Sequence, residues 1–305
     1  MNQIQKRFFL PALLTVGTHL SSFGLEIATL HPLLADMASQ IGGEKVQVIE
    51  LIGRSDDPHD FTPSPSTLAK ASSARLVVAS GKGMESHYLE ELKDNLSPQQ
   101  IVFEAGGRVY SIRTDPVEFG TDHHHHDHEG TIDPHWWHDP DNMRQASREL
   151  ANVMSYIDPQ NRDLYMGNLQ SYRNELSLLD DWIEEQVAFI PKERRILVTP
   201  HLAFGYFCRK YDFTPVAAKG FQNEQMVSQR ELGEILRYLK ENDVAAIFTE
   251  RGMNPKFIHS LAKEAGLPVG GALYADGIGL PESSGYVDMM RSNVETIVTA
   301  LRKGM

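Results

Sequence analysis

Short apolar, β-branched runs recur along this chain, and each is followed by a turn and then by a helical pattern. Strands that alternate with helices are typical of α/β folds, in which mostly parallel sheets are flanked by helices. Ligands of such sheets bind beyond the carboxyl ends of the strands. Functional side chains are therefore expected just after the predicted strands, which are residues 46–52, 74–79, 101–104, 196–199, 244–249 and 269–274.

The strongest helix signal lies between the two groups of strands, over residues 158–190. Asp158 and Pro159 form an N-cap followed by proline at the first helical position, and Pro191 ends the pattern. A helix of this length would span on the order of 45 Å, so we interpret it as a connection along two lobes. An ordinary amphipathic helix inside one domain is the alternative. Apolar residues recur in it at intervals of three or four, at Leu169, Tyr172, Leu176, Leu179, Ile183, Val187 and Ile190.

The length of 305 residues exceeds the size at which one hydrophobic core usually stops growing, so two domains are expected. The predicted division is a signal peptide at 1–24, an N-terminal α/β lobe at 25–157 with a loop at 115–131, the linking helix at 158–190, and a C-terminal α/β lobe at 191–305.

The N-terminus has the outline of a secretory signal, because Lys6 and Arg7 precede a short apolar run and small residues at Ser22 and Gly24. A buried N-terminal helix is the alternative. Cys208 is the only cysteine, so we expect no internal disulfide and no lipid-bearing cysteine near the predicted cleavage site. The prediction is a soluble periplasmic protein that is not lipid-anchored, with Cys208 in its core.

Charge and histidine content both indicate a protein that handles cations. The formal charge of -12 argues against nucleic acid or an anionic membrane surface as the main partner, because both require basic patches. Seven of the 13 histidines fall between His123 and His138, interleaved with carboxylates. Neutral imidazole is the side chain best suited to Zn, Cu, Ni or Fe, so a transition metal is predicted.

Four motifs place a potential ligand at the end of a strand: Asp-Pro-His-Asp-Phe-Thr-Pro-Ser-Pro at 57–65, Asp-Pro-His-Trp-Trp-His-Asp-Pro at 133–140, Thr-Pro-His-Leu-Ala-Phe-Gly-Tyr-Phe at 199–207 and Leu-Tyr-Ala-Asp-Gly at 273–277. In the second motif, Asp139-Pro140 is also a helix N-cap signal. The motifs, in this order, resemble those of the zinc and manganese solute-binding proteins of bacterial metal ABC transporters. The resemblance extends to the segment 285–294.

This resemblance implies two α/β lobes joined by one long helix, with a metal held in the cleft between them. It places ligands at His59 and His135 in the N-terminal lobe and at His201 and Asp276 in the C-terminal lobe. Three imidazoles and one carboxylate suit tetrahedral Zn²⁺. Manganese-selective relatives carry glutamate at the position of His201, so histidine there favours zinc, although Cu²⁺ would bind such a site at least as well.

The neighbouring aromatic and histidine residues are assigned other roles. Trp136 and Trp137 are predicted to pack in the core. His138 is predicted to face solvent at the start of a helix, with support of the metal site or ligation as the alternatives. Structural or exposed positions are expected for His31, His87 and His259.

The run of histidines in the loop 115–131 receives a separate interpretation. An internal His-rich loop resembles that of zinc-binding members of the transporter family, which implies an auxiliary role in collecting metal. A solvated loop without a role is one alternative. A zinc hydrolase is another, because the run matches a His-x-His-x-Asp-His pattern. The residues concerned are His123, His124, His125, His126, Asp127 and His128.

The predicted function is that of an exported, non-enzymatic protein that captures Zn²⁺ and delivers it to an ABC permease driven by its ATPase. A zinc-donating metallochaperone is a further expected partner, and the protein is expected to be a monomer. A zinc-binding adhesin or buffer without a transporter is the alternative, together with the hydrolase. Because ligand histidines must be neutral, metal affinity should fall as the pH falls.

Overall fold

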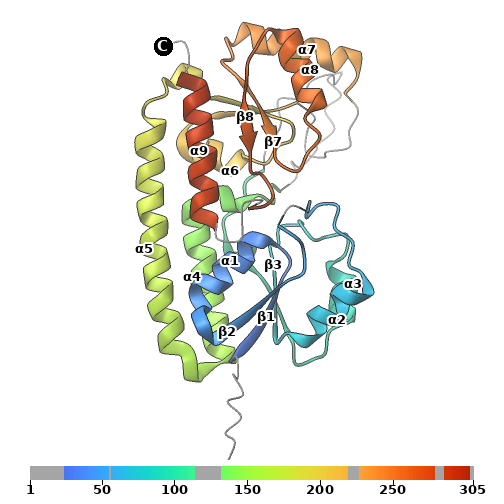
Figure 1. Cartoon of the computed structure of the whole chain (residues 1–305), viewed down its shortest axis with the longest axis vertical. Helices are drawn as coiled ribbons and strands as arrows, with labels where there is room; N and C mark the ends of the chain where they lie inside the picture. The colour runs from blue at the N-terminus through green and yellow to red at the C-terminus, as the bar shows by residue number, and fades with distance from the viewer. Residues whose placement is uncertain (1–23, 55, 114–131, 219–226, 279–284, 303–305) are drawn as a thin grey trace, which may run out of the picture.

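The structure is a computed structural model that describes residues 24–54, 56–113, 132–218, 227–278 and 285–302 (Figure 1). The predicted signal peptide, apart from residue 24, and the whole predicted His-rich loop 115–131, including His123 to His128, lie outside the described residues. The described chain forms two α/β lobes, one above the other in the view of Figure 1. None of the described helices is long and apolar enough to span a membrane.

The N-terminal lobe contains a parallel four-stranded sheet in the order β2-β1-β3-β4. Alternation along β1 sends Ile27 into the core beneath the helices α1 and α4, and Ala28 into a second core beneath α2 and α3. Helices therefore cover both faces of the sheet, as parallel sheets require. The elements are β1 (Leu25–Thr29), α1 (Pro32–Gly42), β2 (Val46–Glu50), α2 (Pro65–Ser73), β3 (Leu76–Ala79), α3 (Leu89–Asp94), β4 (Ile101–Glu104) and α4 (Pro140–Ile157).

The C-terminal lobe repeats this arrangement with a parallel sheet in the order β6-β5-β7-β8. Residues of α7 and α8 pack on one face of the sheet in a core of their own. The other face joins the large core that contains residues of α6 and α9. The elements are β5 (Ile196–Thr199), α6 (Gly205–Tyr211), β6 (Thr214–Ala217), α7 (Gln229–Glu241), β7 (Ile247–Glu250), α8 (Lys256–Ala265), β8 (Val269–Leu273) and α9 (Tyr286–Arg302).

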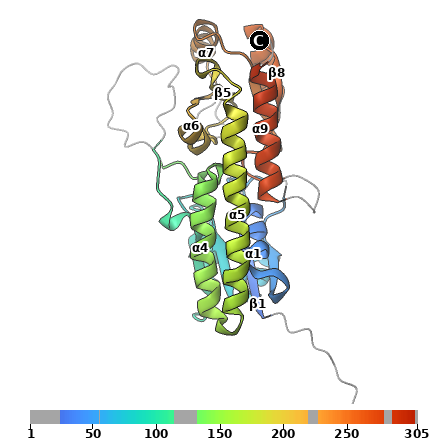
Figure 2. The ribbon, with the colours of Figure 1, turned by 90° about the vertical axis from the view of Figure 1, so that its left-hand side faces the viewer.

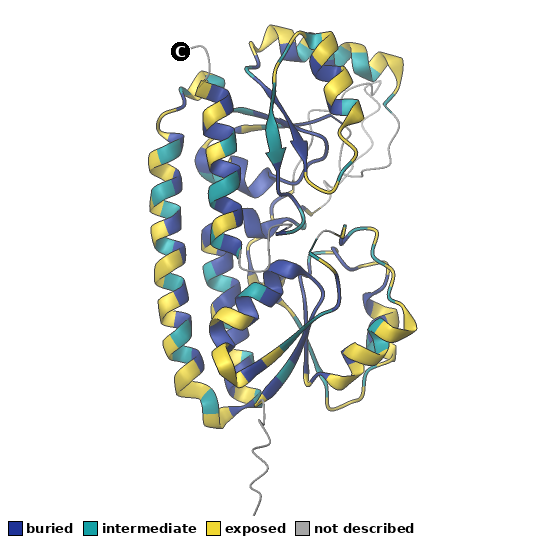
Figure 3. Ribbon diagram, viewed as in Figure 1, coloured by how far each residue is buried: buried dark blue, intermediate teal, exposed yellow. Residues whose placement is uncertain are grey.

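The long helix α5 (Arg162–Val187) runs beside both lobes, against α1 and α4 below and α9 above (Figures 1 and 2). Its buried stripe belongs to one continuous core that reaches into both sheets, and its outer face is mostly exposed (Figure 3). The helix therefore connects the lobes. The stripe consists of Tyr165, Leu169, Tyr172, Leu176, Leu179, Ile183 and Val187.

Several observed elements are shorter than the predicted ones, since β2 ends at Glu50, β3 begins at Leu76 and α5 ends at Val187. A 3₁₀ turn at Pro159–Asn161 precedes α5, so Asn161 rather than Asp158 occupies its N-cap. The predicted strand 244–249 begins later, at Ile247. The strands β1 and β6 were not predicted; Pro215 in β6 fits the edge of the sheet, where one backbone donor can be dispensed with.

Candidate metal centre

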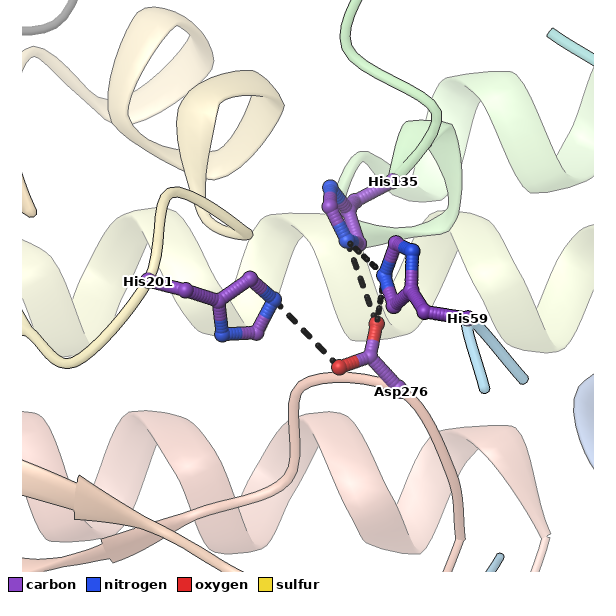
Figure 4. A group of neighbouring side chains, drawn as sticks. All are labelled: His59, His135, His201 and Asp276. Carbon is purple, nitrogen blue, oxygen red and sulfur yellow. Dashed lines mark hydrogen bonds and ion pairs between the residues drawn. The ribbon is translucent and has the colours of Figure 1, made fainter. Parts of the chain in front are cut away.

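Four side chains from four separate segments meet between the lobes (Figure 4). His59 lies in the loop after β2, His201 directly after β5, and Asp276 after β8. His135 does not follow a sheet strand as expected; it immediately precedes the 3₁₀ turn Trp136–His138 that leads into α4. The α4 N-cap is Asp139, as predicted, and its side chain accepts a hydrogen bond from the Asp141 amide.

The distances between the four side chains suit a small cation. The Nε2 atoms of His59 and His135 are 3.1 Å apart, and Asp276 Oδ1 lies 3.1 Å from His135 Nε2 and 3.5 Å from His59 Nε2. His201 Nε2 lies 3.4 Å from Asp276 Oδ2. One candidate ligand atom from each residue lies within 4.8 Å of all the others. No further group of this kind occurs within the described ranges.

The burial of the centre favours a bound cation. His135 and His201 have side chains that are 1% exposed, against 27% for His59 and 13% for Asp276. Both His201 Nε2 and Asp276 Oδ1 are buried and make no hydrogen bond among the described residues, although charged groups lie 3.1 to 3.5 Å away across the centre. Unpartnered polar atoms in the interior are unfavourable, and a cation at their common focus would satisfy them.

Two further carboxylates, which the sequence did not single out, lie behind the histidines. Asp133 Oδ1 is 2.7 Å from His135 Nδ1, and Glu250 Oε2 is 2.5 Å from His201 Nδ1. Both carboxylates are buried. Each orients its imidazole so that Nε2 faces the centre, an arrangement common around metal-binding histidines. Glu250 is the last residue of β7, which pairs with β5. A carboxylate at the end of a predicted strand is the one feature of the sequence that could have indicated it.

Neighbouring charged groups determine which side chains of the centre are protonated before a metal binds. Burial opposes protonation of His135, but Asp276 and Asp133 outweigh it and raise its pKa to about 10. Burial likewise opposes the proton on His201, and Glu250 with Asp276 raises its pKa. Burial would raise the pKa of Asp276, yet His201 and His135 hold it well below the usual value. A metal must therefore displace protons from imidazoles.

The other histidines and the tryptophans near the centre differ in their surroundings. His138 is fully buried, so the prediction that it faces solvent was wrong. Its Nε2 lies 2.9 Å from the Ala275 carbonyl oxygen, in the opposite lobe. Trp136 and Trp137 are buried, as predicted. His31 is buried and caps α1, whereas the side chains of His87 and His259 are exposed.

A pocket of about 260 Å³ lies beside the centre at Asp276. Asp276 belongs to its lining, together with Arg54, Asp56 and Asp57 of the N-terminal lobe and Arg251 of the C-terminal lobe. His59, the most exposed of the four residues, comes from the same loop as the two aspartates. The most exposed of the four residues therefore lies on the same loop as part of this pocket's lining.

Comparison with known proteins identifies the family. The family model described as zinc-uptake complex component A, periplasmic, matches residues 27–300. The chain is 30% identical over 288 residues to the manganese-binding lipoprotein MntA of Halalkalibacterium halodurans, covering 93% of this chain and 91% of the relative. It is 26% identical to the manganese ABC transporter substrate-binding lipoprotein PsaA of Streptococcus pneumoniae, with the same coverage of 93% and 91%.

Solved structures agree with this result. The periplasmic zinc binding protein TroA from Treponema pallidum superimposes with a TM-score of 0.81 at 25% identity, covering 92% of this chain and 99% of that one. A ZnuA crystal structure superimposes with a TM-score of 0.79 at 23% identity, covering 91% and 99%, and shows the shared fold. The chain therefore belongs to the ZnuA family of solute-binding proteins of metal ABC transporters, which are extracytoplasmic metal-binding proteins and not enzymes.

Proposed function

We propose that this protein captures Zn²⁺ between its lobes, with His59, His135, His201 and Asp276 as the ligands, and delivers it to the permease of an ABC importer. The observation that carries the proposal is the convergence of three imidazole nitrogens and one carboxylate in a buried position. The family relationship supports the partnership with a permease and its ATPase.

The geometry and the donor atoms support zinc. Tetrahedral Zn²⁺ with bonds of roughly 2.0 to 2.1 Å places neighbouring ligand atoms about 3.3 Å apart. His59 Nε2, His135 Nε2 and Asp276 Oδ1 lie 3.1, 3.1 and 3.5 Å from one another, and His201 Nε2 lies 3.4 Å from the other oxygen of Asp276. One ligand atom from each of the four residues lies within 4.8 Å of the others. Three nitrogen donors are softer than the oxygen-rich shells that manganese prefers.

Manganese is the second candidate, because relatives named as manganese-binding are among the most similar sequences. Equilibrium competition between Zn²⁺ and Mn²⁺ for the purified protein decides between the two. We expect zinc to displace manganese at equal concentrations, since the Irving–Williams order and the imidazole donors act in the same direction. Retention of manganese against zinc would contradict the zinc proposal.

The ligand assignment is tested by measuring zinc affinity with residues 115–131 deleted, so that loop histidines do not contribute. His59→Ala, His135→Ala and His201→Ala are each expected to weaken binding strongly. His259→Ala is the matched control, because this histidine is exposed on α8, outside the centre. Wild-type affinity in all three centre variants would contradict the assignment.

We also propose that the loop with His123 to His128 collects additional zinc weakly. Interleaved histidines and carboxylates attract cations without a fixed geometry. Metal analysis is expected to find one tightly held zinc that depends on the centre and extra, weak zinc that is lost with residues 115–131. Equal metal content with and without the loop would remove this role.

The remaining expectations concern the state of the protein in the cell. We propose that it works as a monomer and accepts zinc from a metallochaperone, which light scattering and metal-transfer assays test. The absence of a lipid anchor stays a prediction, in tension with relatives named lipoproteins. This prediction rests on the fact that the sequence has a single cysteine, Cys208, which is buried. Mass spectrometry of the exported protein tests it.

A further inference from the structure

One backbone carbonyl in the C-terminal lobe accepts hydrogen bonds from two buried side chains of the N-terminal lobe. The Ala275 oxygen lies 3.0 Å from Trp137 Nε1 and 2.9 Å from His138 Nε2. Both rings are at most 1% exposed. Ala275 immediately precedes Asp276, and Trp137 and His138 follow His135 by two and three residues, so this contact joins candidate ligands of opposite lobes.

The two donors are themselves held in place. The Tyr286 hydroxyl, at the start of α9, donates to the Trp137 carbonyl at 2.7 Å. The His138 ring packs on Phe204, with ring centres 4.5 Å apart. Burial lowers the pKa of His138 to about 3, so the imidazole is neutral and carries its single proton on Nε2, where the carbonyl accepts it.

The acceptor is fixed from its own lobe as well. Asn293 of α9 forms two backbone hydrogen bonds with Tyr274, accepting from its amide and donating to its carbonyl, each at 2.8 Å. The segment after β8 is thus held by α9 at Tyr274 and by the opposite lobe at Ala275. The carboxylate of Asp276 then lies 3.1 Å from His135 Nε2.

We propose that Trp137 and His138 are positioning residues that clamp the Ala275 carbonyl and thereby keep Asp276 beside His135. Separating the lobes here would leave two buried donors and one acceptor without partners, which is unfavourable. The centre is most exposed at His59, and the 260 Å³ pocket next to Asp276 is also lined by Arg54 and Asp57 of the N-terminal lobe. We therefore expect metal to leave past the His59 loop while the clamp stays closed.

The experiment measures the rate at which zinc leaves the full-length protein when a chelator is added in excess. The inference rests on the proposed zinc site. Trp137→Phe and His138→Phe keep an aromatic ring but remove the donor, and each is expected to accelerate release by about threefold to tenfold, the loss of one neutral hydrogen bond. The association rate is expected to stay unchanged, because neither substitution alters His59, the most exposed of the four candidate ligands.

Trp136→Phe is the matched control. Its neighbouring indole is equally buried and donates to the Ser80 carbonyl at 3.1 Å, but within the N-terminal lobe. This variant should lose stability without faster release. His138→Gln keeps an N–H donor near the same position and should release zinc at close to the wild-type rate.

Three outcomes would overturn the clamp. Wild-type release rates in Trp137→Phe and His138→Phe would do so, as would equal acceleration in Trp136→Phe or no difference between His138→Phe and His138→Gln. If Trp137→Phe does not fold, the two His138 variants decide. A wild-type protein that retains no zinc would contradict the proposed function and the clamp together, whereas zinc retention with unchanged variants contradicts the clamp alone.

Discussion

At the scale of single residues, the candidate centre depends on carboxylates that do not face it. Asp133 and Glu250 each bind the Nδ1 side of an imidazole and leave Nε2 directed at the common focus. They also raise the pKa of these imidazoles, which makes protons the natural competitors of the metal. A carboxylate that orients a histidine thus affects both the affinity for metal and its dependence on pH.

Glu250→Gln is expected to lower zinc affinity by about tenfold to a hundredfold, because the amide no longer carries the charge that orients and polarises His201. Competition with a chromophoric chelator measures the affinity, and the thermal unfolding midpoint verifies the fold. Glu241→Gln, an exposed carboxylate at the end of α7, is the control and should bind zinc like the wild type. Equal zinc affinities of Glu250→Gln and Glu241→Gln would contradict the orienting role of Glu250.

Zinc binding is expected to release more than one proton near pH 6.5, from His135 and in part from His201, because both pKa values are raised and both imidazoles must be neutral to bind. Affinity should therefore fall as the pH falls. Since the pKa of His135 is about 10, the decline starts well above the ordinary imidazole range. Calorimetry in two buffers of different ionisation enthalpy measures the proton count, and identical heats would contradict it.

At the scale of elements, α5 is the helix on which both lobes pack. Leu179 is fully buried in the shared core, while the preceding residue, Leu178, is 67% exposed. Leu176 and Ile183 continue the buried stripe at intervals of three and four residues from Leu179. Stability should therefore depend on one face of this helix and hardly at all on the other.

Leu179→Ala is expected to lower the free energy of unfolding by about 2 to 5 kcal/mol, because it removes buried methyl groups and leaves a cavity. Leu178→Ala offers the same chemical change on the exposed face and should stay within about 0.5 kcal/mol of the wild type. Denaturant unfolding measures both. Similar losses in the two variants would show that α5 does not pack along its predicted stripe.

At the scale of the whole molecule, the connection between the lobes is continuous. The helices α5 and α9 pack on each other, α1 contacts both, and a single hydrophobic core extends through them into both sheets. Asp36 of α1 accepts a hydrogen bond from the Tyr286 amide at the start of α9, at 2.9 Å. Wide hinge closure would disrupt this packing, so we expect metal exchange to involve smaller movements of loops.

The radius of gyration in solution is accordingly expected to be the same with and without zinc, within the precision of X-ray scattering. The control for effects of the ion on the solvent is the His135→Ala variant, first stripped of metal and then measured with and without added zinc. Compaction by several ångströms on zinc binding would instead indicate closure of whole lobes.

Zinc at a hundredfold excess over its dissociation constant is expected to stabilise the folded protein by about 2.7 kcal/mol, since it binds the folded state alone. Removal of the metal by a chelator should lower the thermal midpoint accordingly. The His135→Ala variant should show no such response. A midpoint insensitive to zinc in the wild type would argue against a site formed only by the folded lobes.

The sequence by itself determined the class of fold and the identity of the converging residues. The apolar runs of the strands, the periodicity of the helices and the N-cap at Asp139 depend on residues that are close in sequence, so they can be predicted without a structure. The family motifs indicated His59, His135, His201 and Asp276, which the structure brings together. The histidine run from His123 to His128 was more conspicuous, but its repetition carried less positional information than the patterned setting of His135.

Only the tertiary structure decided which partners lie behind these residues. Glu250 reaches His201 because β7 pairs with β5, and His138 is buried because the opposite lobe supplies the Ala275 carbonyl. Glu250 is visible in the sequence only as a carboxylate at a strand end, and nothing in the local sequence indicates the partner of either residue. A histidine at the start of a helix is predicted from sequence to face solvent, because the sequence does not show that a second lobe covers it. Periodicity is a local property, whereas burial and hydrogen-bond partners depend on how distant segments pack.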